Sequence, residues 1–340
     1  MDTGPQDGGG TIAVAPMMDW TDRHCRVLHR RLNPSLVLFT EMVTAKAVLF
    51  GDRDRLLGHS EEERPLVLQL GGSDPGELAE AAQIAAEWGY DEVNLNCGCP
   101  SDRVQGGRFG ACLMREPALV GECLAAMAEG GLPVSLKCRL GVDEQDVEPA
   151  LDAVADAAVA AGASAIWVHA RKAWLQGLSP AQNRTVPPLD HDRVVRLCAR
   201  LPSTFVGLNG GIGDEGAVRA ALATMDGVMI GRAAYQRPGL LAELGGRHGL
   251  ASGAHRLAVA RSMVDYARAV LEDRGRLAPV VKPMLGLFHG EPGARAYRRT
   301  LSEDGHRAGA GADVLSGALD ALEIARERSG PDLEARSVAA

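Results

Sequence analysis

The sequence has no long apolar run and no cysteine spacing typical of a metal site. None of its apolar stretches approaches the ~20 residues that cross a bilayer. Residues 1–10 are Gly-rich and acidic, unlike a secretion signal or a membrane anchor. The seven cysteines form no CxxC pair, which argues against a zinc site or a disulfide framework and favours reduced thiols. We therefore expect a cytoplasmic protein with no membrane partner.

Two other motifs are missing. No GxGxxG follows an early strand-like run, so a Rossmann dinucleotide site is not indicated. No cluster of His, Asp and Glu has the spacing of metal ligands, so we expect no metal and no metal-dependent hydrolysis. The net charge of −8 argues against strong nonspecific binding of nucleic acid by the molecule as a whole. The 340 residues suffice for one large α/β domain and a smaller one.

Short apolar runs alternate with helix-like stretches through the first 245 residues. The runs are compact and flanked by Gly or Pro, as expected for strands buried on both faces. The predicted strands are 12–17, 36–43, 66–71, 92–97, 133–140, 165–170, 204–210 and 227–232. The predicted helices are 21–32, 74–88, 117–129, 148–161, 190–200 and 214–224, with at best one short irregular helix between 40 and 66. Eight evenly spaced repeats favour a closed (β/α)8 TIM barrel over a doubly wound sheet.

The strand pattern stops near residue 245, which predicts a smaller C-terminal helical domain. From 253 to 328 the sequence predicts helices, interrupted only by the apolar pair Val280-Val281. The expected segments are a disordered N-terminus over 1–11, a barrel over 12–245, a helical domain over 246–330 and a flexible tail over 331–340.

The predicted helical domain is the basic part of the chain. It carries 13 Lys and Arg against 10 Asp and Glu, a net charge of +3 in a chain of −8. Its densest basic cluster is Arg295, Arg298 and Arg299, and a helix would place Arg295 and Arg298 on one face. A solvated helix face is the ordinary explanation of such a cluster, but the contrast in charge favours phosphate contact.

Cys99 follows the predicted strand 92–97 in a Gly-Cys-Pro turn. Gly98 relaxes the backbone and Pro100 fixes its own φ, so the turn presents Cys99 at a rigid strand end. A cysteine thiol ordinarily has a pKa of about 8.5 and can donate or accept a proton near neutral pH. The alternative is a buried structural thiol.

Other polar residues follow the remaining strands, where a barrel places its catalytic side chains. These strand ends are Pro16-Met17-Met18, Gln69, Asn96, Lys137 with Arg139, His169 with Arg171, Asn209-Gly210-Gly211 and Gly231-Arg232. The glycines after the last two strands, with Arg232 beside them, favour a phosphate site over simple tight turns.

Three of these side chains suit a flavin. Lys137 lies within an apolar run and needs a partner, either a salt bridge such as one to Glu41 or an anionic cofactor ring. Gln69 offers donors and an acceptor to an amide-like edge such as a flavin pyrimidine. His169 is either a cofactor contact or a satisfied core histidine. Together with the phosphate site they suggest flavin mononucleotide (FMN).

The sequence closely resembles the tRNA-dihydrouridine synthases, and within them the A-type bacterial subfamily, from about residue 12 to about residue 305. The matching blocks are 15–22, 40–43, 69–74, 96–114, 169–174, 209–212, 226–229, 231–235, 284–288 and 292–295. The resemblance implies an FMN enzyme, working as a monomer on tRNA, that reduces the C5=C6 bond of D-loop uridines at positions 20 and 20a. NADPH would reduce FMN, hydride would pass to C6, and Cys99 would give a proton to C5.

The resemblance also implies roles for individual residues. Asn96 would contact the target base, and Arg139 would help to hold it. The residues around FMN would be Pro16, Met17, Met18, Gln69, Lys137, His169, Asn209, Gly210, Gly211, Gly231 and Arg232. The residues that contact RNA would be Arg171, Arg184, Arg295 and Arg298.

Three positions depart from the family pattern. Cys97 stands where an aliphatic residue is expected, which leaves a second thiol that is either an alternative acid or packed on the opposite face of the strand. Ala181 replaces a longer polar residue, and Lys282-Pro283 replaces Arg-His. Two other functions stay open: an FMN barrel acting on a small pyrimidine, as dihydroorotate dehydrogenases do, and an RNA-binding protein without catalysis.

Overall fold

The computed structural model describes residues 10–101, 107–245 and 252–329. The chain forms two compact units: a barrel unit, Met1–Arg23 with Leu36–Gly231, and a helical unit, His24–Ser35 with Arg232–Ala340. The disorder expected for the first residues and the tail expected over 331–340 fall almost wholly outside the described residues.

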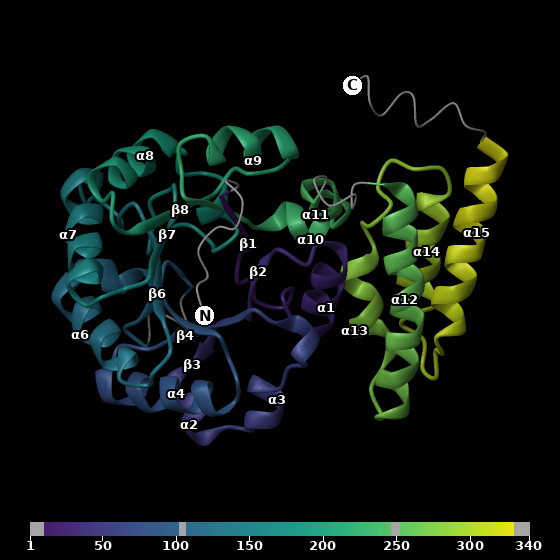
Figure 1. The fold of residues 1–340 in the computed structure, drawn as a ribbon, viewed down its shortest axis with the longest axis horizontal. Coiled ribbons are helices and arrows are strands. Elements are labelled where there is room, and N and C mark those ends of the chain that lie inside the picture. Colours follow the sequence, from purple (N-terminus) through teal and green to yellow (C-terminus); the bar gives the residue numbers. More distant parts are fainter. Residues whose placement is uncertain (1–9, 102–106, 246–251, 330–340) are drawn as a thin grey trace. The chain divides into compact units, whose positions relative to one another are not determined.

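Eight parallel strands close the barrel (Figure 1). They are β1 (Thr11–Val14), β2 (Val37–Phe39), β4 (Leu66–Gly71), β5 (Glu92–Cys97), β6 (Val134–Arg139), β7 (Ala165–His169), β8 (Phe205–Asn209) and β9 (Gly227–Ile230). Neighbours in this order pair in parallel, and β9 pairs with β1 to complete the ring. The predicted (β/α)8 TIM barrel is therefore confirmed.

The helices of the barrel unit begin where the sequence supplies capping side chains. Asp74, Asp146, Asp190 and Asp214 each accept a hydrogen bond from a backbone N–H in the first turn of the helix that follows. These four helices are α4 (Pro75–Glu87), α7 (Val147–Ala160), α8 (His191–Arg200) and α9 (Glu215–Leu222). The fifth, α6 (Pro117–Ala128), begins instead with a proline, and Glu116 before it makes no side-chain cap bond. The predicted helices of this region agree with them to within three residues at each end.

The segment between residues 40 and 66 is more ordered than the sequence predicts. It contains the two-residue strand β3 (Val43–Thr44), α2 (Ala45–Phe50), α3 (Arg53–Leu57) and a 3-10 turn over Glu61–Glu63. Thr44 caps α2 and Asp52 caps α3 through their side-chain oxygens. Caps stabilise helices that are too short to show a periodic apolar face, so the pattern does not reveal them.

An aromatic cluster fills part of the barrel interior. Trp167 of β7 packs edge-on against Phe39 of β2, with ring centroids 6.3 Å apart. Its ring is tilted against that of Phe205 of β8, with centroids 5.2 Å apart. The indole occupies space left by Gly207, where a Cβ would lie 2.2 Å from Trp167 Cε3. Gly227 leaves similar room, because a Cβ there would lie 2.5 Å from Phe205 Cζ. The glycines on β8 and β9 therefore permit a tryptophan inside the barrel.

The helical unit combines C-terminal helices with one early helix. Its helices are α1 (Arg23–Leu32), α10 (Arg232–Gln236), α11 (Gly239–Leu244), α12 (Gly253–Glu272), α13 (Leu277–Val281), α14 (Ala294–Glu303) and α15 (Asp313–Ser329). Asn33, just after α1, donates to the carbonyl of Leu241 at 3.1 Å, and His255 of α12 hydrogen-bonds the carbonyl of Leu32 at 3.1 Å. These bonds explain why α1 groups with helices more than 200 residues later in the chain.

Two details of this unit differ from the sequence-based prediction. Val280-Val281 does not interrupt the helices but ends α13, and both side chains are completely buried. A short apolar pair without periodicity is equally compatible with a strand and with a buried helix. The compact unit also begins at Arg232 rather than at 246, because α10 and α11 group with it. No helix in the described part of the chain is long and apolar enough to cross a membrane.

Gly207→Ala should lower the free energy of unfolding by about 1–3 kcal/mol, because the new methyl group displaces Trp167. Chemical denaturation followed by tryptophan fluorescence measures the loss. Gly213→Ala is the matched control, because a Cβ there meets nothing within 4 Å. We expect that control to stay within about 0.5 kcal/mol of wild type. Equal stability of the two variants would contradict this account of the barrel interior.

Candidate active site

Strand register brings most of the predicted site residues to one end of the barrel. Gln69 pairs with Asn94, Asn96 with Lys137, and Arg139 with His169, which in turn pairs with Asn209. These residues occupy alternate positions of β4 to β8, so their side chains share one side of the sheet. Because all the strands are parallel, their carboxyl ends form a single mouth.

The Cys99 turn is fixed by one amide side chain. Asn96 Oδ1 accepts hydrogen bonds from the backbone N–H of Gly98, at 3.1 Å, and of Cys99, at 3.0 Å. The carbonyl of Cys99 accepts from the N–H of Ala111 at 2.9 Å. The thiol itself is partly exposed, and its nearest hydrogen-bond partner is the Ser101 hydroxyl at 3.5 Å. The turn therefore presents Cys99 rather than burying it.

Cys97 has the opposite environment. It is completely buried, lies beside Cys138 of β6, and belongs to the other face of β5 from Asn96. Burial raises the pKa of the Cys97 thiol well above its ordinary value, and the neighbouring thiols of Cys138 and Cys123 add to the shift. The prediction that Cys97 packs on the opposite face is confirmed.

Lys137 has an amide partner, and no carboxylate among the described residues pairs with it. Its ammonium donates to Asn209 Oδ1 at 3.1 Å, and Asn209 Nδ2 donates to the carbonyl of Met229 at 2.7 Å. Lys137 forms no ion pair with any residue the structure describes, and Glu41 instead accepts from the backbone N–H of Asp19. Of the two alternatives for Lys137, the salt bridge to Glu41 is therefore wrong, and the contact with an anionic cofactor ring stays a prediction. Removal from water, aided by the charge of Arg139, lowers the pKa of Lys137 to about 8.

His169 is held neutral at the same mouth. Burial lowers its pKa well below the ordinary value, and the charges of Arg139, Lys137, Arg171 and Arg184 act in the same direction. Neither ring nitrogen hydrogen-bonds another residue in the described part of the chain. A neutral imidazole has one N–H donor and one acceptor, so His169 can bond a ligand through either.

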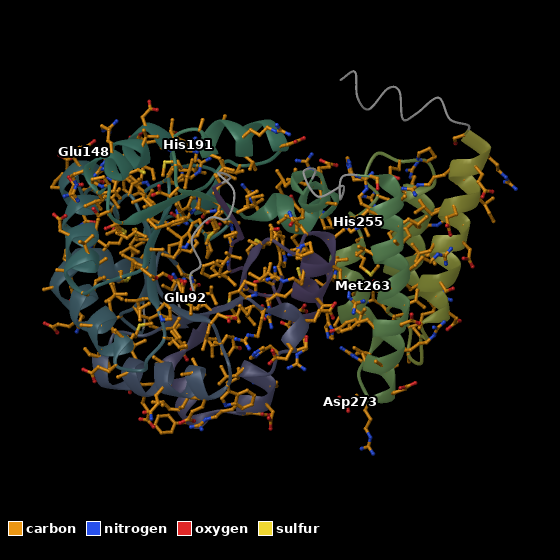
Figure 2. The ribbon with its side chains drawn as sticks, viewed as in Figure 1. Glu92, Glu148, His191, His255, Met263 and Asp273 are labelled. Atoms are coloured by element: carbon orange, nitrogen blue, oxygen red, sulfur yellow. The ribbon has the colours of Figure 1, made fainter. Side chains whose placement is uncertain are left out.

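The backbone after β8 approaches this histidine closely. Gly210 and Gly211 have φ values of +106° and +76°, and a Cβ on Gly210 would lie 2.6 Å from His169 Cδ2. The carbonyl of Gly210 is hydrogen-bonded by His191 at the start of α8, which Figure 2 labels, at 2.8 Å. Outside the strand ladder, no described residue accepts from the N–H of Gly210 or Gly211. These two groups can therefore face an anion.

Arg139 holds three loops together. Its Nε donates to the carbonyl of Gly98 at 2.9 Å, and its Nη1 donates to those of Lys172, at 3.1 Å, and Asn183, at 2.8 Å. Burial lowers the pKa of Arg139 to about 10; Arg184 and Arg171 act in the same direction, and Cys99 opposes it. Most of this guanidinium serves the protein backbone, so the predicted contact with the base stays a prediction for Nη2 alone.

Asn183 is a residue of these loops that the sequence pattern does not reveal. It is completely buried, and its amide nitrogen donates to the carbonyls of Trp174, at 2.8 Å, and Leu178, at 3.1 Å. Its amide oxygen accepts from the N–H of Trp174 at 2.7 Å. A buried asparagine inside a polar loop produces no periodic pattern in the sequence. Its only signal is its place directly before Arg184, a predicted RNA contact.

The remaining predicted residues occupy different settings. Gln69 is buried, and its amide bonds Asn94 and Asn96 at 2.8 and 2.7 Å, so its flavin contact stays a prediction. Arg171 donates to the carbonyls of Thr185 and Pro187. Exposed or half-buried positions are taken by Pro16, Met17, Met18, Arg184 and Gly231 in the barrel unit and by Arg232, Arg295 and Arg298 in the helical unit.

Comparison with known proteins gives a consistent picture. The family model described as dihydrouridine synthase matches residues 13–323. The chain is 54% identical to a tRNA-dihydrouridine(20/20a) synthase of Xanthomonas campestris pv. campestris, over 97% of this chain and 96% of that protein. It is 50% identical to the protein of that name in Shewanella oneidensis, over 92% and 94%, and 48% identical to that of Shigella flexneri, over 91% and 92%.

Two solved structures share the barrel. Morphinone reductase matches with a TM-score of 0.51 at 14% identity, over 70% of this chain and 86% of that chain. A 2-naphthoyl-CoA reductase complex matches with a TM-score of 0.52 at 11% identity, over 69% and 50%. At such identities the likeness shows a common fold and nothing more.

Lys137 should titrate near pH 8, against about 10.4 for an ordinary lysine. Between these values the unfolded chain binds more protons, so the contribution of Lys137 to stability rises with pH across that window. Labelling with an amine reagent over a pH series, read by mass spectrometry, locates the midpoint, with exposed Lys46 as the internal reference. A Lys137 midpoint at the ordinary value would contradict the buried, cation-flanked environment.

Proposed function

The chain belongs to the dihydrouridine synthase family, and we propose that it reduces uridine in tRNA to dihydrouridine at the barrel mouth, with bound FMN and with NADPH as the reductant. The relatives reported above are named for tRNA positions 20 and 20a, which supports the D-loop as the target.

The observation that carries the proposal is the partly exposed thiol of Cys99 beside a cationic mouth. The reaction adds a hydride to C6 of the uracil ring and a proton to C5. Cys99 Sγ supplies the proton, because the Asn96 bonds hold its turn at the strand end. Lys137 and Arg139 both interact electrostatically with Cys99, so the thiol lies close to these two cations.

The residues around the mouth fit FMN. Gly210 and Gly211 offer backbone N–H groups to its phosphate, and a Cβ on Gly231 would meet only open space. Lys137 offers a cation to the electron-rich edge of the ring, and neutral His169 offers a donor. When bound, the flavin supplies the hydride. Asn209 orients Lys137 toward this position by accepting from its ammonium.

Two surfaces suit the tRNA backbone. Near the mouth, Arg184 is exposed on the loop after β7. On α14, Arg295, Arg298 and Arg299 are exposed, while Tyr297 and Leu301 are buried on the other side. None of the three arginines forms an ion pair with a residue the structure describes. Cations without protein partners are available to phosphates.

Cys99→Ala should separate the two halves of the reaction. We expect unchanged flavin content and unchanged flavin reduction by NADPH, but a ~10²–10⁴-fold slower oxidation of the reduced flavin by tRNA, because the general acid is lost. Stopped-flow absorbance of the flavin measures both steps. Cys198→Ala, a partly exposed thiol on α8, is the control and should behave as wild type. Protein that takes up no FMN would refute the cofactor, and a fast tRNA step in Cys99→Ala would refute the acid.

Replacing both Arg295 and Arg298 with Ala should weaken tRNA binding and make it less salt-dependent. Each lost phosphate contact reduces the log–log salt slope by up to about 0.9. The control replaces Arg268 and Arg276, which are exposed in the same unit but lie outside α14. Binding titrations at several salt concentrations give the slopes. Equal slopes for wild type and the α14 double variant would mean that this face is only solvated, and tRNA would then need another docking surface, around Arg171, Lys172 and Arg184.

A further inference from the structure

A continuous chain of buried hydrogen bonds runs from the Cys99 turn to Glu92. Asn96 Nδ2 donates to Gln69 Oε1 at 2.7 Å, and Gln69 Nε2 donates to Asn94 Oδ1 at 2.8 Å. Asn94 Nδ2 donates to the Ser135 hydroxyl at 2.8 Å. Ser135 in turn donates to the carboxylate of Glu92, the first residue of β5, which Figure 2 labels. We call these five residues the polar chain.

Alternation along β5 explains how the polar chain forms. Glu92, Asn94 and Asn96 are spaced two residues apart, so they share one face of the strand. Gln69 on β4 and Ser135 on β6 lie on either side and bridge the gaps between them. Asn94 and Ser135 are completely buried, and Gln69 is 1% exposed. In such surroundings a polar group without a hydrogen-bond partner is costly. Loss of one bond in the polar chain therefore also destabilises the bonds next to it.

The direction of every bond is determined by the two ends. At the top, the backbone N–H groups of Gly98 and Cys99 can only donate, so the oxygen of Asn96 must face them. At the other end, an ionised carboxylate on Glu92 can only accept, so the Ser135 hydroxyl must donate its proton to Glu92. Each amide between them then has one orientation that satisfies both neighbours, and reversing any one breaks the next bond.

We propose that Glu92, Ser135 and Asn94 are positioning residues that orient the Asn96 amide and thereby the Cys99 turn. All three precede the carboxyl-terminal residues of their strands, and each acts through its neighbour in the polar chain. The inference rests on the proposed function, because it assigns these residues to proton transfer from Cys99. Burial raises the pKa of Glu92 to about 7, and the bond from Ser135 opposes this shift by stabilising the ionised form. The experiment is therefore run at pH 8, where the carboxylate predominates.

Ser135→Ala removes both the acceptor for Asn94 and the donor to Glu92. We expect oxidation of the reduced flavin by tRNA to slow about tenfold or more, because the thiol is misplaced. Flavin content and reduction by NADPH should not change. In the free protein, the rate at which iodoacetamide alkylates Cys99, mapped by mass spectrometry, should change several-fold. Ser164→Ala is the matched control: its hydroxyl bonds the Val134 carbonyl at 3.0 Å and lies outside the polar chain.

A second pair of variants decides the question if Ser135→Ala does not fold. Glu92→Gln keeps an acceptor oxygen for Ser135 and should retain the wild-type tRNA step and alkylation rate. Glu92→Leu removes the acceptor and should slow the tRNA step and alter alkylation. Rescue by Gln but not Leu separates positioning from packing. Wild-type behaviour of Ser135→Ala or of Glu92→Leu would overturn the proposal. A wild-type protein that is inactive on tRNA would instead overturn the proposed function, and the alkylation rates would still test the positioning role.

Discussion

The two hydrogen bonds that Asn96 Oδ1 accepts from the backbone of Gly98 and Cys99 are the constraint on which the site depends. They convert the end of a barrel strand into a turn that holds a thiol partly exposed. Arg139 secures the same turn from the next strand through the carbonyl of Gly98. Because both residues belong to regular strands, the position of Cys99 is set by the barrel, which is more rigid than its loops.

The electrostatics of the mouth follow from the same strands. Lys137 and Arg139 lie two residues apart on β6, and Arg171 and Arg184 lie on the loop after β7. Their combined charge lowers the pKa of His169 beyond the effect of burial. A neutral histidine among four cations leaves the mouth positive, which suits an anionic flavin and RNA phosphates while keeping an N–H available. The amide of Asn209 takes the place of a carboxylate beside Lys137, so the positive charge is not cancelled.

The sequence predicts the barrel well because its strands are continuous apolar runs bounded by glycine or proline. The predicted ranges 66–71 and 92–97 coincide with β4 and β5. The residues predicted at the ends of these strands, Gln69 and Asn96, lie at the same end of the barrel. The prediction fails where the cause is not local. The partner of Lys137 is set by register across three strands, and the grouping of α1 with the helical unit depends on contacts with Leu241 and His255. The polar chain also escapes prediction, because Asn94 and Ser135 look like ordinary polar interruptions of a strand.

The activity proposed for this chain is the conversion of uridine in tRNA to dihydrouridine. Mass-spectrometric mapping of host tRNA, with the gene intact, deleted and restored, tests it most directly. We expect deletion to remove the mass of two hydrogens from D-loop uridines, and restoration of the wild-type gene, but not of a gene encoding Cys99→Ala, to return it. Unchanged dihydrouridine in the deletion strain, with the protein shown to be produced in the parent, would contradict it.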